Sequence, residues 1–244
     1  MRKIAAKPRA PRSAVAAILA ELRRVGRPAR RKVAEWYFPS AMRTFGVAAP
    51  DLRRVTRAWS RELRQALARD VLRLAQGLVA ARVTDARTAA YEILSRHAAA
   101  MAALDARSVT ALGRGNDNWG SVDAFSVLVA GAAWRQGRID DSVIARWARS
   151  KDRWRRRTAL VSTVPLNLRS RGGTGDPART LAVCERLIDD RDDMVVKGVS
   201  WALRALSVPK PAAVHTFLAR HRTRLAPRVL REVGNKLRTG RKNP

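Results

Sequence analysis

Residues 152–158 are DRWRRRT and residues 192–198 are DDMVVKG, so the two stretches align at an offset of 40 residues. This alignment places Arg157 over Lys197. A further Asp-x-Trp begins at Asp117, 35 residues before the first of these stretches. Recurrence at this spacing is typical of stacked helix pairs, in which each pair buries its apolar face against its neighbours. The alternative is chance recurrence of Asp and Arg in an arginine-rich chain.

Helical periodicity extends along nearly the whole chain, and no alternating strand pattern occurs. Ser13 is expected to cap a helix that runs to about Val25, and Pro50 stands where a proline in the first turn of a helix belongs. Further helices are expected over residues 51–67, 70–81, 85–104, 105–112, 117–136, 140–149, 152–168, 177–188, 192–207, 210–221 and 226–238. The sequence therefore predicts an all-α fold, a HEAT-like or armadillo-type helical repeat solenoid with a concave basic groove.

The domain organisation follows from composition. Residues 1–12, MRKIAAKPRAPR, are basic and interrupted by proline, which predicts a flexible N-terminal arm. Residues 13–240 are expected to form a single domain. Within it, residues 169–177, RSRGGTGDP, are predicted to be a flexible loop. Its glycines are not followed by the Lys-Ser/Thr of a phosphate-binding loop, so we expect no nucleotide site there.

The charge of the chain points to a polyanionic partner. Lys and Arg number 50 against 20 Asp and Glu, a formal net charge of +30. DNA or RNA is the first candidate. A membrane surface is the other, but there is no apolar run of about eighteen residues and no signal peptide, so we expect a soluble, cytoplasmic protein associated with the nucleoid. The single Cys184 and three scattered histidines predict no metal site.

Asp123 is the most informative single residue. The stretch from Asn118 to Trp134, NWGSVDAFSVLVAGAAW, contains no other charge. An ionised carboxylate on a helix packed on both sides is costly to desolvate unless something compensates it. Trp119 lies four residues earlier, on the same helical face, so an aromatic ring and a carboxylate would project together. The alternative is a structural Asp, either at a helix cap or bonded to a neighbouring Arg.

With these motifs in view, the chain resembles the AlkD-like DNA alkylation repair family, the alkylpurine DNA glycosylases with HEAT-like repeats. The resemblance covers roughly residues 30–238. It rests on four motifs in the order and spacing of that family: Tyr37 with Gly46-VAAP-Asp51-LRR, Trp119-GSV-Asp123, Trp154-RR-Arg157-TA, and Lys197-GVS-Trp201-ALR.

The resemblance implies an enzyme that hydrolyses the N-glycosidic bond of cationic N3- and N7-alkylated purines in double-stranded DNA. It implies no cofactor and no metal, and we expect a monomer. By motif, Asp123 would be the catalytic carboxylate, Trp119 and Trp201 aromatic walls beside the lesion, and Arg157 a clamp on the DNA backbone. The same resemblance implies that Tyr37 is a further contact in the cleft.

Lys197 completes the expected DNA-binding residues. Structural alternatives exist for three of the residues named: packing for Trp201 and Tyr37, and an ion pair with Asp192 or Asp193 for Arg157.

The chain also departs from the family pattern. Gly120 follows Trp119 where family members often carry an acidic residue, and the basic N-terminus and residues 169–176 have no clear counterpart. Two other functions stay open. One is a non-catalytic repeat protein that binds branched or damaged DNA, and the other is an RNA-binding helical repeat. Against the latter, no base-contacting set recurs in each repeat.

Overall fold

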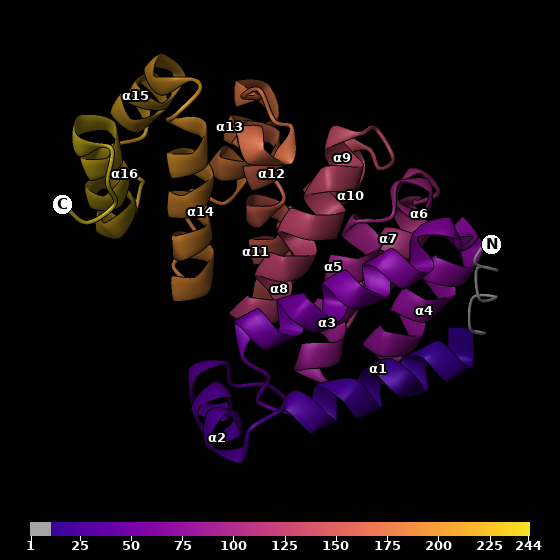
Figure 1. Ribbon diagram of the computed structural model, residues 1–244. Helices are drawn as coiled ribbons and strands as arrows, with labels where there is room; N and C mark the ends of the chain where they lie inside the picture. Colours follow the sequence, from indigo (N-terminus) through magenta and orange to yellow (C-terminus); the bar gives the residue numbers. More distant parts are fainter. Residues whose placement is uncertain (1–10) are drawn as a thin grey trace. The chain divides into compact units, whose positions relative to one another are not determined.

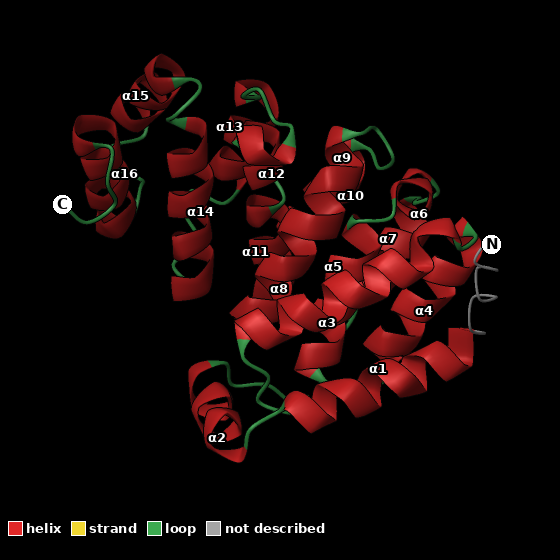
Figure 2. Ribbon diagram, in the orientation of Figure 1, coloured by secondary structure: helices red, strands yellow, loops and turns green. Residues whose placement is uncertain are grey.

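The structure is a computed structural model that describes residues 11–244. Among these residues the regular elements are helices, and the only strand-like pairing is an isolated bridge between Arg43 and Val83 (Figures 1 and 2). The predicted all-α, helical-repeat fold class is confirmed. By contacts the chain divides into two compact units, residues 1–121 and 122–244, and each is described by itself.

The first described helix of the first unit starts within residues 1–12, where the sequence predicts a flexible arm. Residues 1–10 of that predicted arm lie outside the described residues, but Pro11 already belongs to α1. The helices of this unit are α1 (Pro11–Val25), α2 (Pro28–Tyr37), α3 (Ala49–Glu62), the short 3-10 helix η1 (Leu63–Gln65), α4 (Ala68–Ala80), α5 (Thr84–Ser95), α6 (Ala98–Ala102) and α7 (Ala106–Leu112). Helix α8 (Trp119–Phe125) carries the boundary between the units.

The core of the first unit forms where α1 packs against α3 and α4, and α4 against α5. Helix α4 presents Val71, Leu74 and Leu78 to this core at helical spacing, and all three are buried. Burying a Val or Leu side chain contributes about 1.5–3 kcal/mol, so this apolar stripe is what holds α4 in place.

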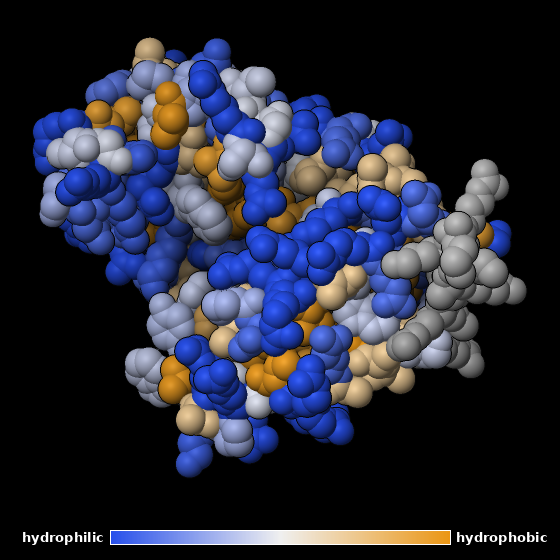
Figure 3. All heavy atoms as spheres, in the orientation of Figure 1, coloured by the Kyte–Doolittle hydropathy of each residue, from blue (hydrophilic) through white to orange (hydrophobic). Residues whose placement is uncertain are grey.

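One face of α3 is strongly basic. Leu52, Val55 and Trp59 of α3 are buried, while the opposite face exposes arginines. Figure 3 shows hydrophilic residues gathered over this helix. They border a hollow of about 680 Å³ whose lining includes Arg53, Arg54, Arg57, Arg61, Arg64 and Arg96. Such a face suits the polyanionic partner that the net charge predicts.

The second unit contains the helix pairs predicted by the 40-residue offset. Its elements are η2 (Ser126–Ala130, a π-helical turn), α9 (Gly131–Arg135), α10 (Asp141–Ala148), α11 (Arg153–Val161), α12 (Val164–Asn167), the 3-10 turn η3 (Arg169–Arg171), α13 (Pro177–Arg186), α14 (Asp193–Leu206), α15 (Pro211–Arg220) and α16 (Pro227–Thr239). Helix α11 packs on α14 and α14 on α16, while α10 packs on α13. Equivalent helices of successive pairs are therefore neighbours, as in a repeat.

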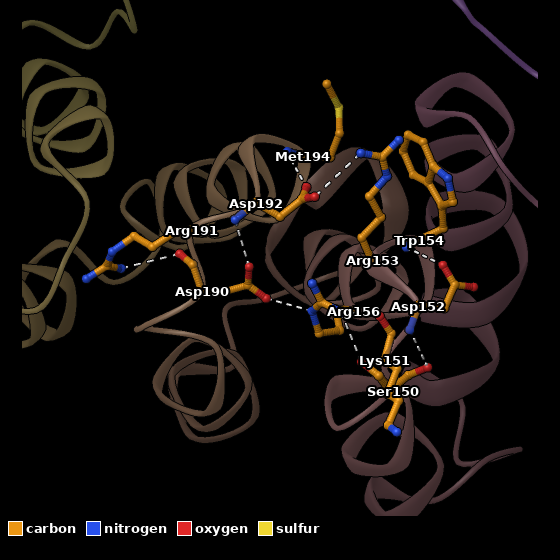
Figure 4. Close-up of polar contacts among 10 residues, drawn as sticks. All are labelled: Ser150, Lys151, Asp152, Arg153, Trp154, Arg156, Asp190, Arg191, Asp192 and Met194. Carbon is orange, nitrogen blue, oxygen red and sulfur yellow. Dashed lines mark hydrogen bonds and ion pairs between the residues drawn. The ribbon is translucent and has the colours of Figure 1, made fainter.

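The aligned aspartates of the repeat are both helix caps (Figure 4). Asp152 accepts a hydrogen bond from the amide of Trp154 at 2.9 Å, and Asp192 accepts one from the amide of Met194 at 2.9 Å. An N-cap of this kind satisfies an amide at the helix start and contributes about 1 kcal/mol. The earlier match at Asp117 does not share this register, because Asn118 accepts the bond from Ser121 there at 3.0 Å.

Ion pairs join successive helix pairs of the second unit. The Nε atom of Arg156 lies 2.6 Å from Asp190, and Arg153 lies 3.5 Å from the capping Asp192 (Figure 4). The Arg156 pair is half-buried, with 19% and 12% of the two side chains exposed. It therefore links α11 to the loop before α14 more firmly than a fully exposed pair would.

Several local predictions differ from the structure, among them the single helix expected over 152–168, which is divided into α11 and α12. Ser13 is not a cap, because α1 already begins at Pro11. The helix expected over 85–104 breaks at His97, whose Nδ1 accepts a hydrogen bond from Ala100 and so starts α6. The loop predicted to be flexible is held in place: Asn167 accepts a hydrogen bond from the Asp176 amide at 2.9 Å. Within the described residues, no helix is long and apolar enough to cross a membrane.

Candidate active site

Asp123 and Arg157 form a bidentate ion pair in the second unit. Arg157 Nε donates to Asp123 Oδ1 at 2.8 Å, and Arg157 Nη2 donates to Oδ2 at 2.8 Å. The Arg157 side chain is 7% exposed and that of Asp123 is 15% exposed. Two parallel charge-assisted bonds fix both the position and the plane of the carboxylate. The compensating group that this carboxylate needs is therefore an arginine 34 residues away in the sequence.

Helix α14 completes the environment of Arg157. The Nη1 atom of Arg157 donates to the main-chain oxygen of Met194, on α14, at 2.6 Å. Gly198 lies beside the arginine stem, where an added Cβ would come within 3.8 Å of Arg157 Cγ and 3.1 Å of Leu160. The small residue lets α14 approach α11 closely enough to receive the guanidinium. All three guanidinium nitrogens of Arg157 thus have partners within the protein.

The chain just after Asp123 makes a π-helical turn, η2. Ser126 donates from its hydroxyl to the Val122 carbonyl at 2.7 Å, and both residues are buried. Gly131 follows, with a backbone so close to its neighbours that an added Cβ would lie 2.4 Å from the Ser162 oxygen. Isolated π-helical turns inside helices occur frequently at functional sites. The helical segment that follows Asp123 is therefore closely packed.

Burial governs the ionisation of Asp123. Desolvation raises the pKa of its carboxyl above the ordinary value of 3.8, and the hydrogen bonds and charge of Arg157 offset part of that rise. Arg157 is thus the group that favours the ionised form of this carboxyl. A partly buried carboxylate with a single fixed counter-ion is typical of groups that stabilise positive charge in a reaction.

Trp119 and Tyr37 come together in the first unit. Their rings are 5.2 Å apart at 81°, and Trp119 Nε1 donates to the Tyr37 main-chain oxygen at 3.2 Å. Phe38 contacts both rings, with its centroid 4.3 Å from that of Trp119 and 4.9 Å from that of Tyr37. A cavity of about 640 Å³ in the same unit is lined in part by Tyr37, Phe38 and Gly120.

Gly120, the departure from the family pattern, has a steric cause. A Cβ at this position would lie 2.8 Å from the ring of Phe38. Phe38 therefore occupies the space that any longer residue at position 120 would need. Nothing in the sequence singles out Phe38, because an aromatic residue at the end of a helix is usually a packing residue.

Trp201 and Lys197 lie on α14 with other neighbours. Trp201 is partly buried and packs on an apolar cluster of Val161, Val164 and Ala205. Lys197 pairs with Asp193 at 2.6 Å on an exposed surface. The structure therefore brings together Asp123 with Arg157, and Trp119 with Tyr37, and it gives Trp201 the packing environment considered as its alternative.

The partner of Arg157 could not be found from sequence. The alternative proposed for it was Asp192 or Asp193, which lie at the aligned repeat position, but those residues cap α14 and pair with Lys197 respectively. The burial of the Arg157 side chain decides the pairing, because its guanidinium lies within hydrogen-bond distance of Asp123 and of the Met194 carbonyl. Met194 and Gly198 are further contributors to the site that sequence reasoning did not single out.

Comparisons with known proteins find matches that cover most of the chain. The family model described as DNA alkylation repair enzyme matches residues 18–237, which spans both compact units. Among solved structures, one described as a predicted DNA alkylation repair enzyme from Enterococcus faecalis matches with a TM-score of 0.68 at 15% identity. That match covers 88% of this chain and 97% of the other, and it shows a shared fold. A search of curated proteins finds no match.

Proposed function

The chain belongs to the DNA alkylation repair enzyme family, and from this premise we propose that it is a DNA glycosylase for cationic N3- and N7-alkylated purines. The bond broken is the one between C1′ of the sugar and the base nitrogen. Its electron pair moves to the base and neutralises the positive charge there. A water oxygen then bonds to C1′ and gives up a proton.

The protein has to supply one anionic group for this reaction and no acid for the leaving base. A positively charged base is already a good leaving group, so it need not be protonated. The sugar, however, acquires oxocarbenium character as the base departs, and a fixed anion stabilises it. One carboxylate also positions the water and accepts its proton. No cofactor or metal enters this scheme.

The observation that carries the proposal is the fixed carboxylate of Asp123. Its neighbours within the helix are uncharged, and Arg157 sets its orientation through two bonds of 2.8 Å. A preorganised charge of this kind costs no reorganisation when the transition state forms. We assign Asp123 as the catalytic carboxylate, and Arg157 as a positioning residue in place of the DNA clamp expected from the resemblance.

The aromatic and basic residues supply binding. We assign Trp119, Tyr37 and Trp201 to contacts with the alkylated nucleotide, because an aromatic face attracts a cationic base with about 0.5–2 kcal/mol. Lys197, on the exposed surface of α14, is assigned to the phosphate backbone of double-stranded DNA.

The direct test uses a duplex with one N7-methylguanine. After incubation with the protein, alkaline treatment cleaves the strand wherever a base has been released. We expect cleavage at the modified position and none in an otherwise identical unmodified duplex. Tight binding of the modified duplex with no cleavage would overturn the glycosylase assignment.

The alternative is a DNA-binding member of the family without catalysis. One observation favours it: both oxygens of Asp123 already accept bonds from Arg157. Each carboxylate oxygen retains a second lone pair, so the pair alone does not prevent catalysis. The same N7-methylguanine assay separates the two functions, because only the glycosylase leaves an alkali-sensitive site.

A further inference from the structure

Helix α2 exposes an unusual amount of apolar surface. Trp36 is 79% exposed, Val33 64% and Tyr37 53%, and α2 contains no buried residue. In Figure 1 this helix stands away from α1 and α3 of the same unit. The cavity of about 640 Å³ described above lies along α2 and is lined by Val33 and Tyr37, which accounts for their exposure. Trp36 does not line it and faces outward.

The charge around Trp36 restricts what can cover it. Arg30, Arg31 and Lys32 precede it on α2, and within that helix the only acid is Glu35, 3.8 Å from Arg31. The whole chain carries +30. A second copy of this chain would therefore be repelled, whereas a polyanion would be attracted. Cations beside an exposed indole suit a nucleic acid, whose phosphates attract the cations and whose bases stack on the ring.

Trp36 is also the outer end of a row of aromatic rings. Its ring lies 6.3 Å from that of Tyr37 at an angle of 26°, and Tyr37 contacts Trp119 at 5.2 Å. The inner end is fixed, because Trp119 packs against Phe38. Trp36 therefore extends the aromatic surface of two predicted site residues toward solvent.

We propose that Trp36 is a base-stacking residue, which packs its exposed indole on a base that has left the stack of a DNA duplex while the cations of α2 hold the adjacent phosphates. Stacking on an aromatic side chain is sequence-tolerant, because every base offers a flat face. Aromatic or apolar residues that enter a base step also favour duplexes that are already weakened at that step. The proposal rests on the proposed function for its choice of DNA as the polyanion.

The test compares two duplexes without any alkylated base: one fully paired, and one with a single unpaired 2-aminopurine. Trp36→Ala is expected to weaken binding to the unpaired duplex about tenfold, within the range of base–aromatic stacking. Trp36→Phe is expected to keep most of the affinity. The matched control is Leu67→Ala, which removes another exposed apolar side chain (55% exposed) of the same unit and should change nothing.

Fluorescence of the 2-aminopurine reports stacking directly. The wild type is expected to quench it on binding, and Trp36→Ala is expected to bind without that quenching. Equal binding and equal quenching by the two proteins would overturn the proposal. So would Trp36-dependent binding to vesicles of phosphatidylserine and phosphatidylcholine with unchanged DNA binding, because α2 would then be a membrane-surface helix. Neither readout needs base excision, so failure here is distinct from failure of the glycosylase assay.

Discussion

Replacing Arg157 by lysine keeps the positive charge beside Asp123 but removes the guanidinium that fixes the position of the carboxylate. The guanidinium makes three bonds, two to Asp123 at 2.8 Å and one to the Met194 carbonyl at 2.6 Å. Lysine keeps the positive charge but offers no planar fork, so it can satisfy only part of this set. The carboxylate of Asp123 would stay close to a cation but lose its fixed plane.

The expected magnitudes follow from burial. Breaking a buried ion pair by removing one partner costs about 3–5 kcal/mol, and since lysine retains the charge we expect about half of that, ~2 kcal/mol, in the free energy of unfolding. A displacement of a catalytic group by about 1 Å costs on the order of a hundredfold in rate. We therefore expect Arg157→Lys to lower single-turnover excision of N7-methylguanine about a hundredfold.

The chain offers a matched control in the preceding arginine, Arg156. Arg156 is half-buried, pairs with Asp190 at 2.6 Å and donates to the carbonyls of Ser150 and Lys151. Arg156→Lys should therefore destabilise the second unit by a similar amount, measured by denaturant unfolding, while excision stays near the wild-type rate.

Two results would refute this reasoning. Equal excision by the two lysine variants would mean that Arg157 does not position Asp123. A loss of affinity for undamaged duplex that parallels the loss of excision would assign Arg157 to the DNA backbone, as the resemblance first suggested.

Three further predictions concern binding, pH and packing. Affinity for duplex DNA should fall with salt, and log K plotted against log salt should have a slope of about −0.9 for each phosphate neutralised. A fluorescence titration that gave the slope of about one phosphate contact would contradict a basic DNA-binding surface. Excision should fall as pH drops through the raised pKa of Asp123, because the ionised form is needed. Asp123 binds its proton more tightly in the folded protein than in the unfolded chain. The free energy of unfolding should therefore rise as pH falls from the folded pKa to 3.8, and this gain should be lost as pH rises again. Asp123→Asn should abolish both the pH dependence of excision, measured in rate profiles, and the pH dependence of stability, measured in melts. Gly131→Ala should destabilise the protein by about 1–3 kcal/mol, because its Cβ would lie 2.4 Å from the Ser162 oxygen. Gly234→Ala, which meets nothing within 4 Å, should instead stabilise α16 by about 0.5–1 kcal/mol in denaturant unfolding.

What the sequence could predict of the fold depended on local chemistry. The aligned Asp152 and Asp192 marked true helix starts, because an N-cap is decided by the residue and the amides just after it. The break at His97 was missed because a histidine cap inside an apolar, alanine-rich run leaves the helical periodicity intact. Helix α2 was also missed, although Val33, Trp36 and Tyr37 follow the i, i+3, i+4 spacing of a helical face; that face is exposed rather than buried in the core.

The candidate site was predictable only in part. Asp123 stood out because it is the single charge in an apolar helix, and the structure gives it the compensation that such a charge requires. Its partner was not predictable, because α8 and α11 meet through tertiary packing that places residues 34 positions apart side by side. The contact between Phe38 and Gly120 is likewise set by the packing of distant segments and left no pattern in the sequence.

The most direct measurement of the central claim is single-turnover excision of N7-methylguanine by Asp123→Asn. This change removes the negative charge and keeps the shape of the side chain. We expect the rate to fall about 10²–10³-fold, the usual worth of a preorganised electrostatic group, with duplex binding unchanged or slightly tighter. Asp190→Asn, which breaks the neighbouring half-buried ion pair, should excise at the wild-type rate. Excision by Asp123→Asn at the wild-type rate would show that Asp123 is not the catalytic group, and failure of that variant to fold would assign the carboxylate a structural role.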